Sequence, residues 1–286
     1  MKTNPPNGKF PMTVRELYEQ GISLLSELET PKTDARAILE YVLNLEFGKL
    51  PLMFPENATE ISGKYLSLIK ERANNKPLSY ITGKKEFFSR DFHVREGVLI
   101  PRPETENLVS AVLERLPDKP VRIADVCSGS GCIGITLALE SSNPVDLYEL
   151  SPEAIAVSQK NAEQLNANKI QIFQTDILSE SLRETYDIIV SNPPYIPLSD
   201  MDLLMPDVVD YEPKMALTDG GDGLLFYRRL VVLAEKHLAD DGILAVEVGI
   251  NLHTPVAELM APLGKVEIIP DYFGVERVVL VKKGAF

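Results

Sequence analysis

VRIADVCSGSGCIGITLALE, residues 121–140, is the stretch that decides the fold class. An apolar strand (121–126) and an apolar helix (131–140) flank a glycine-rich turn, and the same alternation continues along the chain. Alternation of this kind predicts an α/β fold, a mostly parallel sheet with helices on both faces. The remaining strands are expected at 145–150, 169–174, 186–191, 242–248, 265–270 and 275–282, and the remaining helices at 104–116, 152–165, 224–239 and after His253. The last two strands should form an antiparallel pair at the end of the sheet.

The first part of the chain has a helical pattern instead. Thr13 and Glu16 have the spacing of a capping box, and apolar residues then recur on one helical face. Further helices are expected from Thr33 and from about Thr59. A small helical bundle is the simplest architecture for this part.

Between the two patterns, residues 86–100 contain two short β-rich runs. They predict a β-hairpin that turns near Arg95-Glu96-Gly97. We therefore expect three parts, listed here in chain order: an N-terminal helical domain (1–86), a β-hairpin linker (87–103) and an α/β domain with a Rossmann-like sheet (104–286).

Acidic residues outnumber basic ones, and the excess falls in the larger part of the chain. The formal net charge is −13, to which residues 1–86 contribute +1 and residues 87–286 contribute −14. This balance argues against a nucleic acid partner, because phosphate binding needs clustered Lys and Arg. It favours a cationic ligand or a basic protein surface.

Several classes of protein are disfavoured by what the sequence lacks. No apolar run approaches the roughly 20 residues that span a bilayer, and the N-terminus has no apolar signal core, so a cytoplasmic protein is expected. Cys127, Cys132 and three isolated histidines lack metal-ligand spacing, so no metal site is expected.

The glycine-rich turn is the first candidate site. Glycines let the backbone approach a ligand at a helix N-terminus, although such a turn also suits NAD, FAD or a purely structural role. Glu149, at the end of the second strand, can accept ribose hydroxyls, and Asp176, after the third, can accept from an adenine amino group. Because the turn has no basic residue for a pyrophosphate, a cationic, phosphate-free adenosine ligand fits better, namely S-adenosylmethionine. The candidates in the turn are Asp125, Val126, Cys127, Ser128, Gly129 and Gly131.

The second candidate site is Ser191-Asn192-Pro193-Pro194-Tyr195, at the carboxyl end of strand 186–191. Two successive prolines favour an extended backbone and remove two donors. The Asn192 side-chain oxygen and the Pro193 carbonyl can then both accept hydrogen bonds from one planar NH2 group. Tyr195 is expected to pack on the flat face of the substrate. Alignment and polarisation must supply much of the catalysis, because the lone pair of an amide nitrogen is delocalised.

These residues resemble the class I methyltransferases that modify planar NH2 groups, and more narrowly the release factor glutamine N5-methyltransferase family (PrmC/HemK). The resemblance covers nearly the whole chain. It rests on the two sites above and on PLSYITG (77–83), EFF (86–88), LIPRPETE (99–106), YEP (211–213), GGDG (220–223) and DYFGVER (271–277).

The resemblance implies roles for individual residues. Asp125–Gly129, Gly131, Glu149, Asp176, Ile177 and Asn192 would contact S-adenosylmethionine. Asn192, Pro193, Pro194 and Tyr195 would hold the substrate, with Asn192, Pro193 and Tyr195 as catalytic residues. The substrate would be the glutamine of the Gly-Gly-Gln motif in class-1 peptide-chain release factors, and the enzyme is expected to act as a monomer.

Two residues depart from the family pattern. Cys127 stands where the family usually has the first glycine of the turn, and Glu149 is one methylene longer than the commoner Asp. A Cys at this place also suits the sister family that methylates a ribosomal-protein glutamine, so that substrate stays open. An adenine-N6 DNA methyltransferase and a catalytically silent binding protein are further alternatives.

Two other regions have open roles. The helical domain (1–86) is expected to recognise the protein substrate; the alternative is that it only covers the sheet. The stretch 200–222 is either a solvated loop or a surface that attracts basic residues around the substrate glutamine; its acids are Asp200, Asp202, Asp207, Asp210, Glu212, Asp219 and Asp222.

Overall fold

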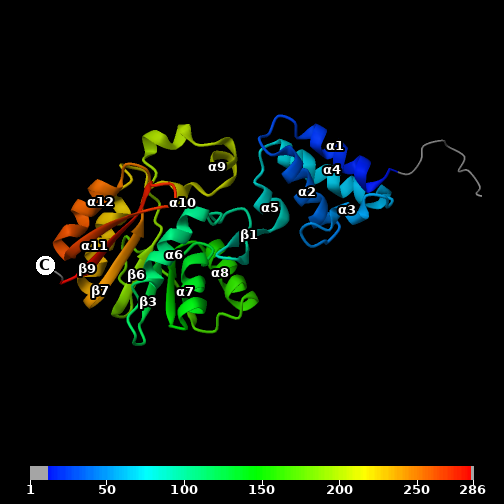
Figure 1. Ribbon diagram of the computed structural model, residues 1–286. Coiled ribbons are helices and arrows are strands. Elements are labelled where there is room, and N and C mark those ends of the chain that lie inside the picture. The colour runs from blue at the N-terminus through cyan, green and yellow to red at the C-terminus, as the bar shows by residue number, and fades with distance from the viewer. Residues whose placement is uncertain (1–11, 285–286) are drawn as a thin grey trace, which may run out of the picture. The chain divides into compact units, whose positions relative to one another are not determined.

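The computed structural model describes residues 12–284, and the chain divides into two compact units between Gly83 and Lys84 (Figure 1). The first strand of the hairpin therefore groups with the second unit. Each unit has its own buried apolar core.

The described part of the first unit is helical. The capping box is confirmed: the Thr13 hydroxyl accepts from the Glu16 backbone N–H, and the Glu16 carboxylate accepts from Thr13 N. Helix α2 begins at Pro31 rather than at the predicted Thr33, because proline suits the first helical position. The helices are α1 (Val14–Leu24), α2 (Pro31–Val42), α3 (Leu50–Met53), α4 (Thr59–Ala73) and α5 (Leu78–Thr82).

The hairpin is present, but its turn lies elsewhere than predicted. Strands β1 (Lys84–Phe87) and β2 (Arg90–His93) pair antiparallel, with Phe87 opposite Arg90. The turn is thus Phe88-Ser89, with φ of 49° and 58°, and not Arg95-Glu96-Gly97. Gly97, with φ 90°, belongs to a later turn in which Val98 N donates to Arg95 O.

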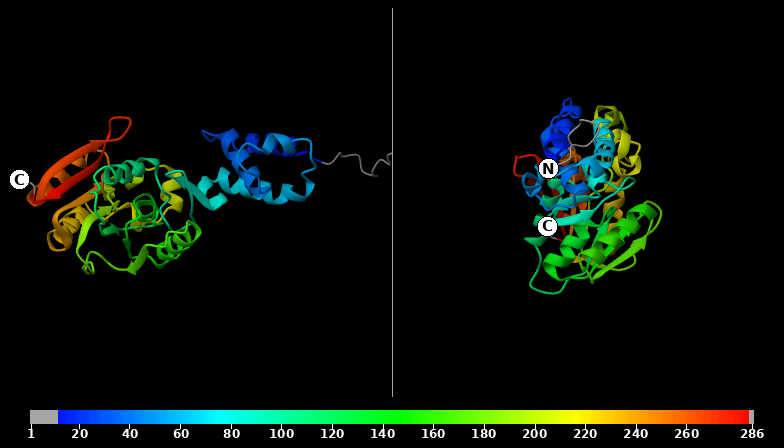
Figure 2. Two further views of the ribbon diagram at one scale, coloured as in Figure 1. Left: turned by 60° about the horizontal axis from the view of Figure 1, so that its bottom comes forward. Right: turned by 90° about the vertical axis from the view of Figure 1, so that its right-hand side faces the viewer.

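The second unit contains a seven-stranded sheet in the order β5-β4-β3-β6-β7-β9-β8. Strands β3 to β7 are parallel to one another, and β9 is antiparallel to both β7 and β8, as expected for the last two strands. Figure 2 shows β8 and β9 together at one edge of this unit. The strands are β3 (Ile123–Val126), β4 (Val145–Glu149), β5 (Ile170–Gln174), β6 (Tyr186–Ser191), β7 (Leu238–Glu247), β8 (Gly264–Pro270) and β9 (Glu276–Lys283).

Helices cover both faces of the sheet (Figure 1). Alternate strand residues enter opposite cores: Ile123 joins the one under α6 and α7, whereas Ala124 joins the one under α11 and α12. The helices of this unit are η1 (Pro103–Thr105), α6 (Glu106–Leu113), α7 (Cys132–Ser141), α8 (Pro152–Gln164), η2 (Leu198–Leu203), α9 (Pro206–Tyr211), α10 (Lys214–Leu217), α11 (Leu225–His237), α12 (His253–Met260) and η3 (Ala261–Leu263).

The strand order determines where on the sheet a ligand site is expected. The chain builds outward from β3 through β4 to β5, then returns to add β6 on the other side of β3. Ligands of open α/β sheets bind at such a switch point, outside the carboxyl ends of the strands. Both sequence motifs lie there, one after β3 and the other after β6.

Candidate active site

The turn after β3 is held in a conformation that favours glycine. Cys127, Gly129 and Gly131 have φ of 61°, 55° and 79°. A Cβ at Gly131 would lie 2.8 Å from Ile135 Cδ1 and 3.0 Å from Ser158 Cβ, so a larger residue there would have to displace its neighbours. For Cys127 the left-handed conformation costs about 1–2 kcal/mol, which is the physical cost of having Cys where the family pattern has glycine.

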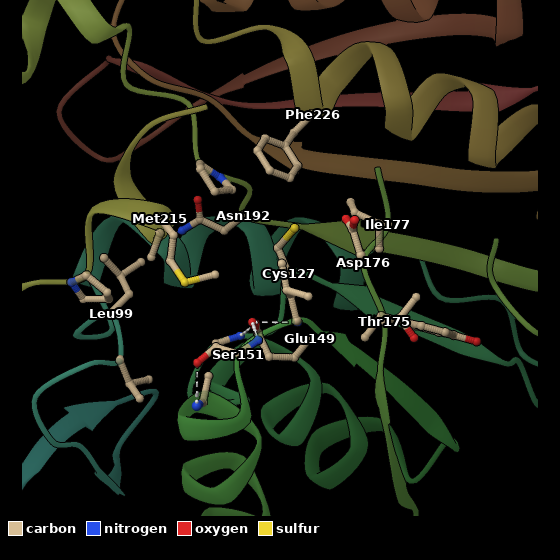
Figure 3. Close-up of a pocket in the computed structure, with 18 of the residues that line it drawn as sticks. Leu99, Cys127, Glu149, Ser151, Thr175, Asp176, Ile177, Asn192, Met215 and Phe226 are labelled. Carbon is tan, nitrogen blue, oxygen red and sulfur yellow. Dashed lines mark hydrogen bonds between the residues drawn. The ribbon is translucent and has the colours of Figure 1, made fainter. Parts of the chain in front are cut away.

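A pocket with a cavity volume of about 110 Å³ lies beside this turn and is partly open to solvent. Of the predicted cofactor residues it is lined by Cys127, Gly129, Glu149, Asp176, Ile177 and Asn192, and of the other predicted substrate residues by Pro194. In Figure 3, Asn192 and Met215 lie on one side and Asp176 and Ile177 on the other, with Cys127 and Glu149 between them. Asp125, Val126, Ser128, Gly131, Pro193 and Tyr195 do not line it.

Glu149 is fixed by three backbone N–H groups (Figure 3). One carboxylate oxygen accepts from Gly129 N at 2.8 Å, and the other accepts from Leu150 N and Ser151 N, both at 2.9 Å. A carboxylate has about four acceptor positions. Glu149 therefore holds the glycine turn in place and keeps an acceptor position for a ligand.

Asp176 is fixed in a similar way at the opposite wall. Its oxygens accept from Leu178 N at 3.0 Å and from the Ser179 hydroxyl at 2.8 Å. These bonds set the carboxylate at the mouth of the pocket beside the apolar side chain of Ile177.

Asp125 lies beneath the pocket. Its side chain is fully buried, with Oδ2 accepting from Gly134 N at 2.8 Å and Oδ1 without a partner among the described residues. Burial, opposed by the Gly134 bond and reinforced by nearby Glu149, raises its pKa to about 8. Burial and neighbouring acids likewise raise the pKa of Cys127, which keeps its thiol protonated.

The segment after β6 presents Asn192 to the pocket. Asn192 Nδ2 donates to the buried Thr105 hydroxyl at 3.2 Å. Because the amide NH2 is engaged there, the opposite atom, Oδ1, remains as the acceptor available to a ligand. Pro193 and Pro194 are buried beside it.

Tyr195 contacts the end of β7. Its hydroxyl donates to Glu247 Oε1 at 3.3 Å, and a Cβ at Gly249 would lie 2.9 Å from its ring. Its predicted place on the flat face of the substrate stays a prediction.

Comparison with known proteins follows the same division of the chain. The family model of the PrmC N-terminal domain matches residues 16–83, and that of the methyltransferase small domain matches residues 105–225. Curated relatives match almost end to end. The release factor glutamine methyltransferase of Clostridium acetobutylicum is 38% identical over 96% of this chain and 99% of its own. The chain belongs to the release factor glutamine methyltransferase family.

Other members of this family match as well. The Neisseria gonorrhoeae protein is 41% identical over 88% of this chain and 93% of its own. Among solved structures, a methyltransferase from Pyrococcus furiosus (TM-score 0.53, 19% identity, covering 79% of this chain and 100% of its own) shares the fold. So does the hMettl16 catalytic domain (TM-score 0.57, 18% identity, covering 78% and 81%).

The structure of this family member adds pocket residues that sequence reasoning missed. Val98 and Leu99 come from the segment after the hairpin, and Pro213, Met215 and Ala216 from the loop beyond Tyr195. The motifs LIPRPETE and YEP already marked both segments, without indicating that they meet. Phe226, on α11, had no sequence signal.

An ion pair between partly exposed Arg102 and buried Glu212 joins these two segments. The Glu212 carboxylate is buried, accepting from Ile100 N at 3.2 Å and from the Arg102 guanidinium. Burial raises the pKa of Glu212 even though Arg102 acts in the opposite direction. Glu212 is therefore part of the pocket wall's support rather than an exposed charge.

Two more acids of the stretch 200–222 act within the fold. Asp219 accepts from Gly221 N, Gly223 N and Leu225 N, and Asp222 pairs with Arg228. The acids exposed to solvent in the first half of this stretch are Asp200, Asp202 and Asp210.

Two kinds of feature are absent from residues 12–284. These residues contain no group of three or more His, Cys, Asp or Glu side chains arranged to hold a metal ion. Nor does this part of the chain include a helix with the length and apolar character that crossing a membrane requires.

Proposed function

We propose that the enzyme transfers a methyl group from S-adenosylmethionine to the side-chain amide nitrogen of the glutamine in the Gly-Gly-Gln motif of a class-1 release factor. The observation that carries this is Asn192, fixed through its NH2 group on Thr105 and leaving its oxygen to accept from an NH2 group. The names of relatives that are 36–41% identical, all release factor glutamine methyltransferases, support this substrate.

The pocket fits the cofactor. None of the residues that line it is Lys, Arg or His, whereas Glu149 and Asp176 supply carboxylates and Ile177, Met215 and Phe226 supply apolar walls. Such a site suits an adenosine ligand that is cationic and lacks phosphate.

We expect Cys127–Gly129, Glu149, Asp176 and Ile177 to hold S-adenosylmethionine, which supplies an electrophilic methyl group on a sulfonium. Asn192 Oδ1 and the Pro193 carbonyl oxygen each accept a hydrogen bond from the glutamine NH2 group. These two acceptors orient the nitrogen and polarise it, since alignment is what an unreactive amide needs most. The enzyme is proposed to act as a monomer.

The test is transfer of labelled methyl to an unmodified release factor, beside the same factor with alanine in place of the Gly-Gly-Gln glutamine. Label should appear on the first and not on the second. Asn192→Ala should lower the rate by on the order of 10²–10³-fold, the typical effect of removing a preorganised polar group, whereas Asn168→Ala, exposed on a loop, should not.

Label on both factors would contradict the choice of glutamine. No label on either, with the cofactor bound, would contradict the release factor as substrate. The ribosomal-protein glutamine would then be assayed next, because the Cys127 departure is shared with that sister family.

A further inference from the structure

Exposed apolar side chains of the second unit gather at one edge of its sheet. The most exposed large apolar residues in the described part of this unit are Leu203, Met205, Ile250, Tyr272 and Phe273, which are between 62% and 92% exposed. The first two follow β6, Ile250 follows β7, and the two aromatic residues lie in the turn between β8 and β9. Exposed apolar side chains that gather in one region indicate an interaction surface.

These segments lie at the edge of the sheet that carries the pocket. Strands β6 and β7 are parallel, so the residues that follow them leave the sheet at the same edge. Strand β9 is antiparallel to β7, with Val278 opposite Glu247, so the β8–β9 turn comes to that edge as well. Since β9 is the second strand from β6, the turn lies roughly 10 Å across the sheet from the end of β6, at about 4.8 Å per strand. A protein that presents a glutamine to Asn192 would therefore reach this turn.

The segment after β7 connects the turn with the predicted substrate residues. On one side, a Cβ at Gly249 would lie 2.9 Å from the Tyr195 ring. On the other side, Val248 N donates to Arg277 O at 2.8 Å, at the start of β9. The exposed residues thus belong to a surface that is continuous with the Asn-Pro-Pro-Tyr segment.

The β8–β9 turn has a fixed backbone. The buried Asp271 side chain accepts from Phe273 N at 2.8 Å and from Val275 N at 3.0 Å. Gly274, with φ 79°, donates from its N–H to the Asp271 main-chain oxygen at 3.0 Å. On this ordered turn the side chains of Tyr272 and Phe273 are both 92% exposed. A backbone that is already ordered lowers the entropic cost of binding, and aromatic residues are common anchors of protein interfaces.

We propose that Tyr272 and Phe273 form an aromatic docking pair that binds an apolar surface of the release factor beside the loop with the target glutamine. The inference rests on the proposed function for the identity of this partner. Exposed acids, among them Asp200, Asp202 and Glu276, lie in segments at the same edge. An interface usually has an apolar centre and a polar rim. The partner surface should therefore be apolar where the two rings bind and basic around them.

The kinetic test removes both rings. The double variant Tyr272→Ser with Phe273→Ser should raise the KM for release factor on the order of tenfold or more, the effect of losing an interface anchor. The kcat, the Tm and the affinity for S-adenosylmethionine should stay unchanged, because neither residue lines the pocket or packs in a core. The matched control is Val232→Ser with Ile268→Ser, two exposed apolar residues on α11 and in the middle of β8. A KM for the aromatic double variant equal to that of the control would overturn the proposal.

A second readout does not depend on methyl transfer. Phe273, replaced by the photoreactive residue p-benzoylphenylalanine, should crosslink to release factor, and the same replacement at Val232 should not. A crosslink from position 273 without methyl transfer supports the docking pair and contradicts the proposed reaction. Methyl transfer with an unchanged KM and no crosslink from position 273 overturns the docking pair and leaves the reaction standing. The absence of both crosslink and transfer contradicts both.

Discussion

The segment PRPETE (101–106) contributes a different contact from nearly each of its polar residues. Arg102 pairs with Glu212, Thr105 accepts from Asn192, and Glu106 accepts from Phe88 N at 2.8 Å. Three parts of the second unit thus meet at one short segment: the hairpin, the turn after β6 and the long loop. A change of one side chain there should act on the pocket without touching a ligand.

At the same scale, Glu149 should respond to loss of its charge. In Glu149→Gln an NH2 group replaces one carboxylate oxygen. This NH2 group would face a backbone N–H whose hydrogen bond Glu149 accepts in the wild type. We expect affinity for S-adenosylmethionine to fall by roughly tenfold or more, because an unsatisfied donor costs about 1–3 kcal/mol. Calorimetry measures this, with the exposed Glu163→Gln on α8 as control. Equal affinities would show that the turn does not depend on Glu149.

The buried Asp125 carboxyl should make the stability of the protein depend on pH. Its pKa is raised by burial from 3.8 to about 8, so folding takes up a proton between these values. Its contribution to stability is full below pH 4 and is lost as the pH rises through about 8. Asp125→Asn keeps an acceptor for Gly134 N and has no such loss. The Tm of the variant should therefore exceed that of the wild type by more at pH 8 than at pH 5. Parallel Tm curves would contradict this.

At the scale of elements, the pair Arg102–Glu212 joins two pocket segments. Arg102→Met should leave the Glu212 side chain, only 1% exposed, without its cation. Since Arg102 is one-third exposed, we expect a loss of about 1–3 kcal/mol rather than the full cost of a buried pair. Hydrogen exchange should accelerate in residues 206–217 and cofactor affinity should fall. The double variant with Glu212→Gln should recover part of both, and additive effects would contradict a direct coupling.

The elements also show what the sequence could predict. The order of strands and helices in the second unit followed from hydrophobic pattern, and the glycine turn and Asn-Pro-Pro-Tyr followed from residue type. The hairpin turn did not, because glycine is the usual signal for positive φ and the actual turn is Phe88-Ser89. Contacts distant in sequence support this turn: Glu106 accepts from Phe88 N, and the Phe88 ring packs on the core.

Thr105 was missed for a related reason. It lies far from Asn192 in sequence, and its residue type is not unusual where it occurs. Only the fold, which brings η1 to the end of β6, places the two side chains in contact. Contacts of this kind depend on tertiary packing, which the local sequence pattern does not report.

At the scale of the whole molecule, the pocket belongs to one unit. All of its lining residues lie between Gly97 and Phe226. We propose that the first unit, which ends at Gly83, recognises the protein substrate. A fragment of residues 84–286 should then bind S-adenosylmethionine within about threefold of the full chain, a difference under 1 kcal/mol, yet transfer methyl to release factor much more slowly. Equal transfer rates would leave the helical unit a structural role only.

Surface charge should affect association with the substrate at this scale as well. Asp200, Asp202 and Asp210 are exposed acids in the loop beyond Tyr195, and we propose that they attract basic residues of the substrate. Changing all three to Asn should slow association on the order of tenfold at low salt and flatten its salt dependence. The control with Asp118, Glu235 and Asp240 neutralised, also exposed, makes the same change of charge elsewhere. Similar kinetics for the two variants would exclude a local effect.

The position of β9 has a consequence for biosynthesis. Residues 276–283 emerge last of all the strands, yet they lie inside the sheet, paired with β7 on one side and β8 on the other. While the ribosome is still adding these residues, β7 has an open edge and β8 has no neighbour. The catalytic unit therefore cannot complete its sheet during translation of its first strands. A truncation that removes residues 276–283 would take away an interior strand, so it should abolish folding of this unit.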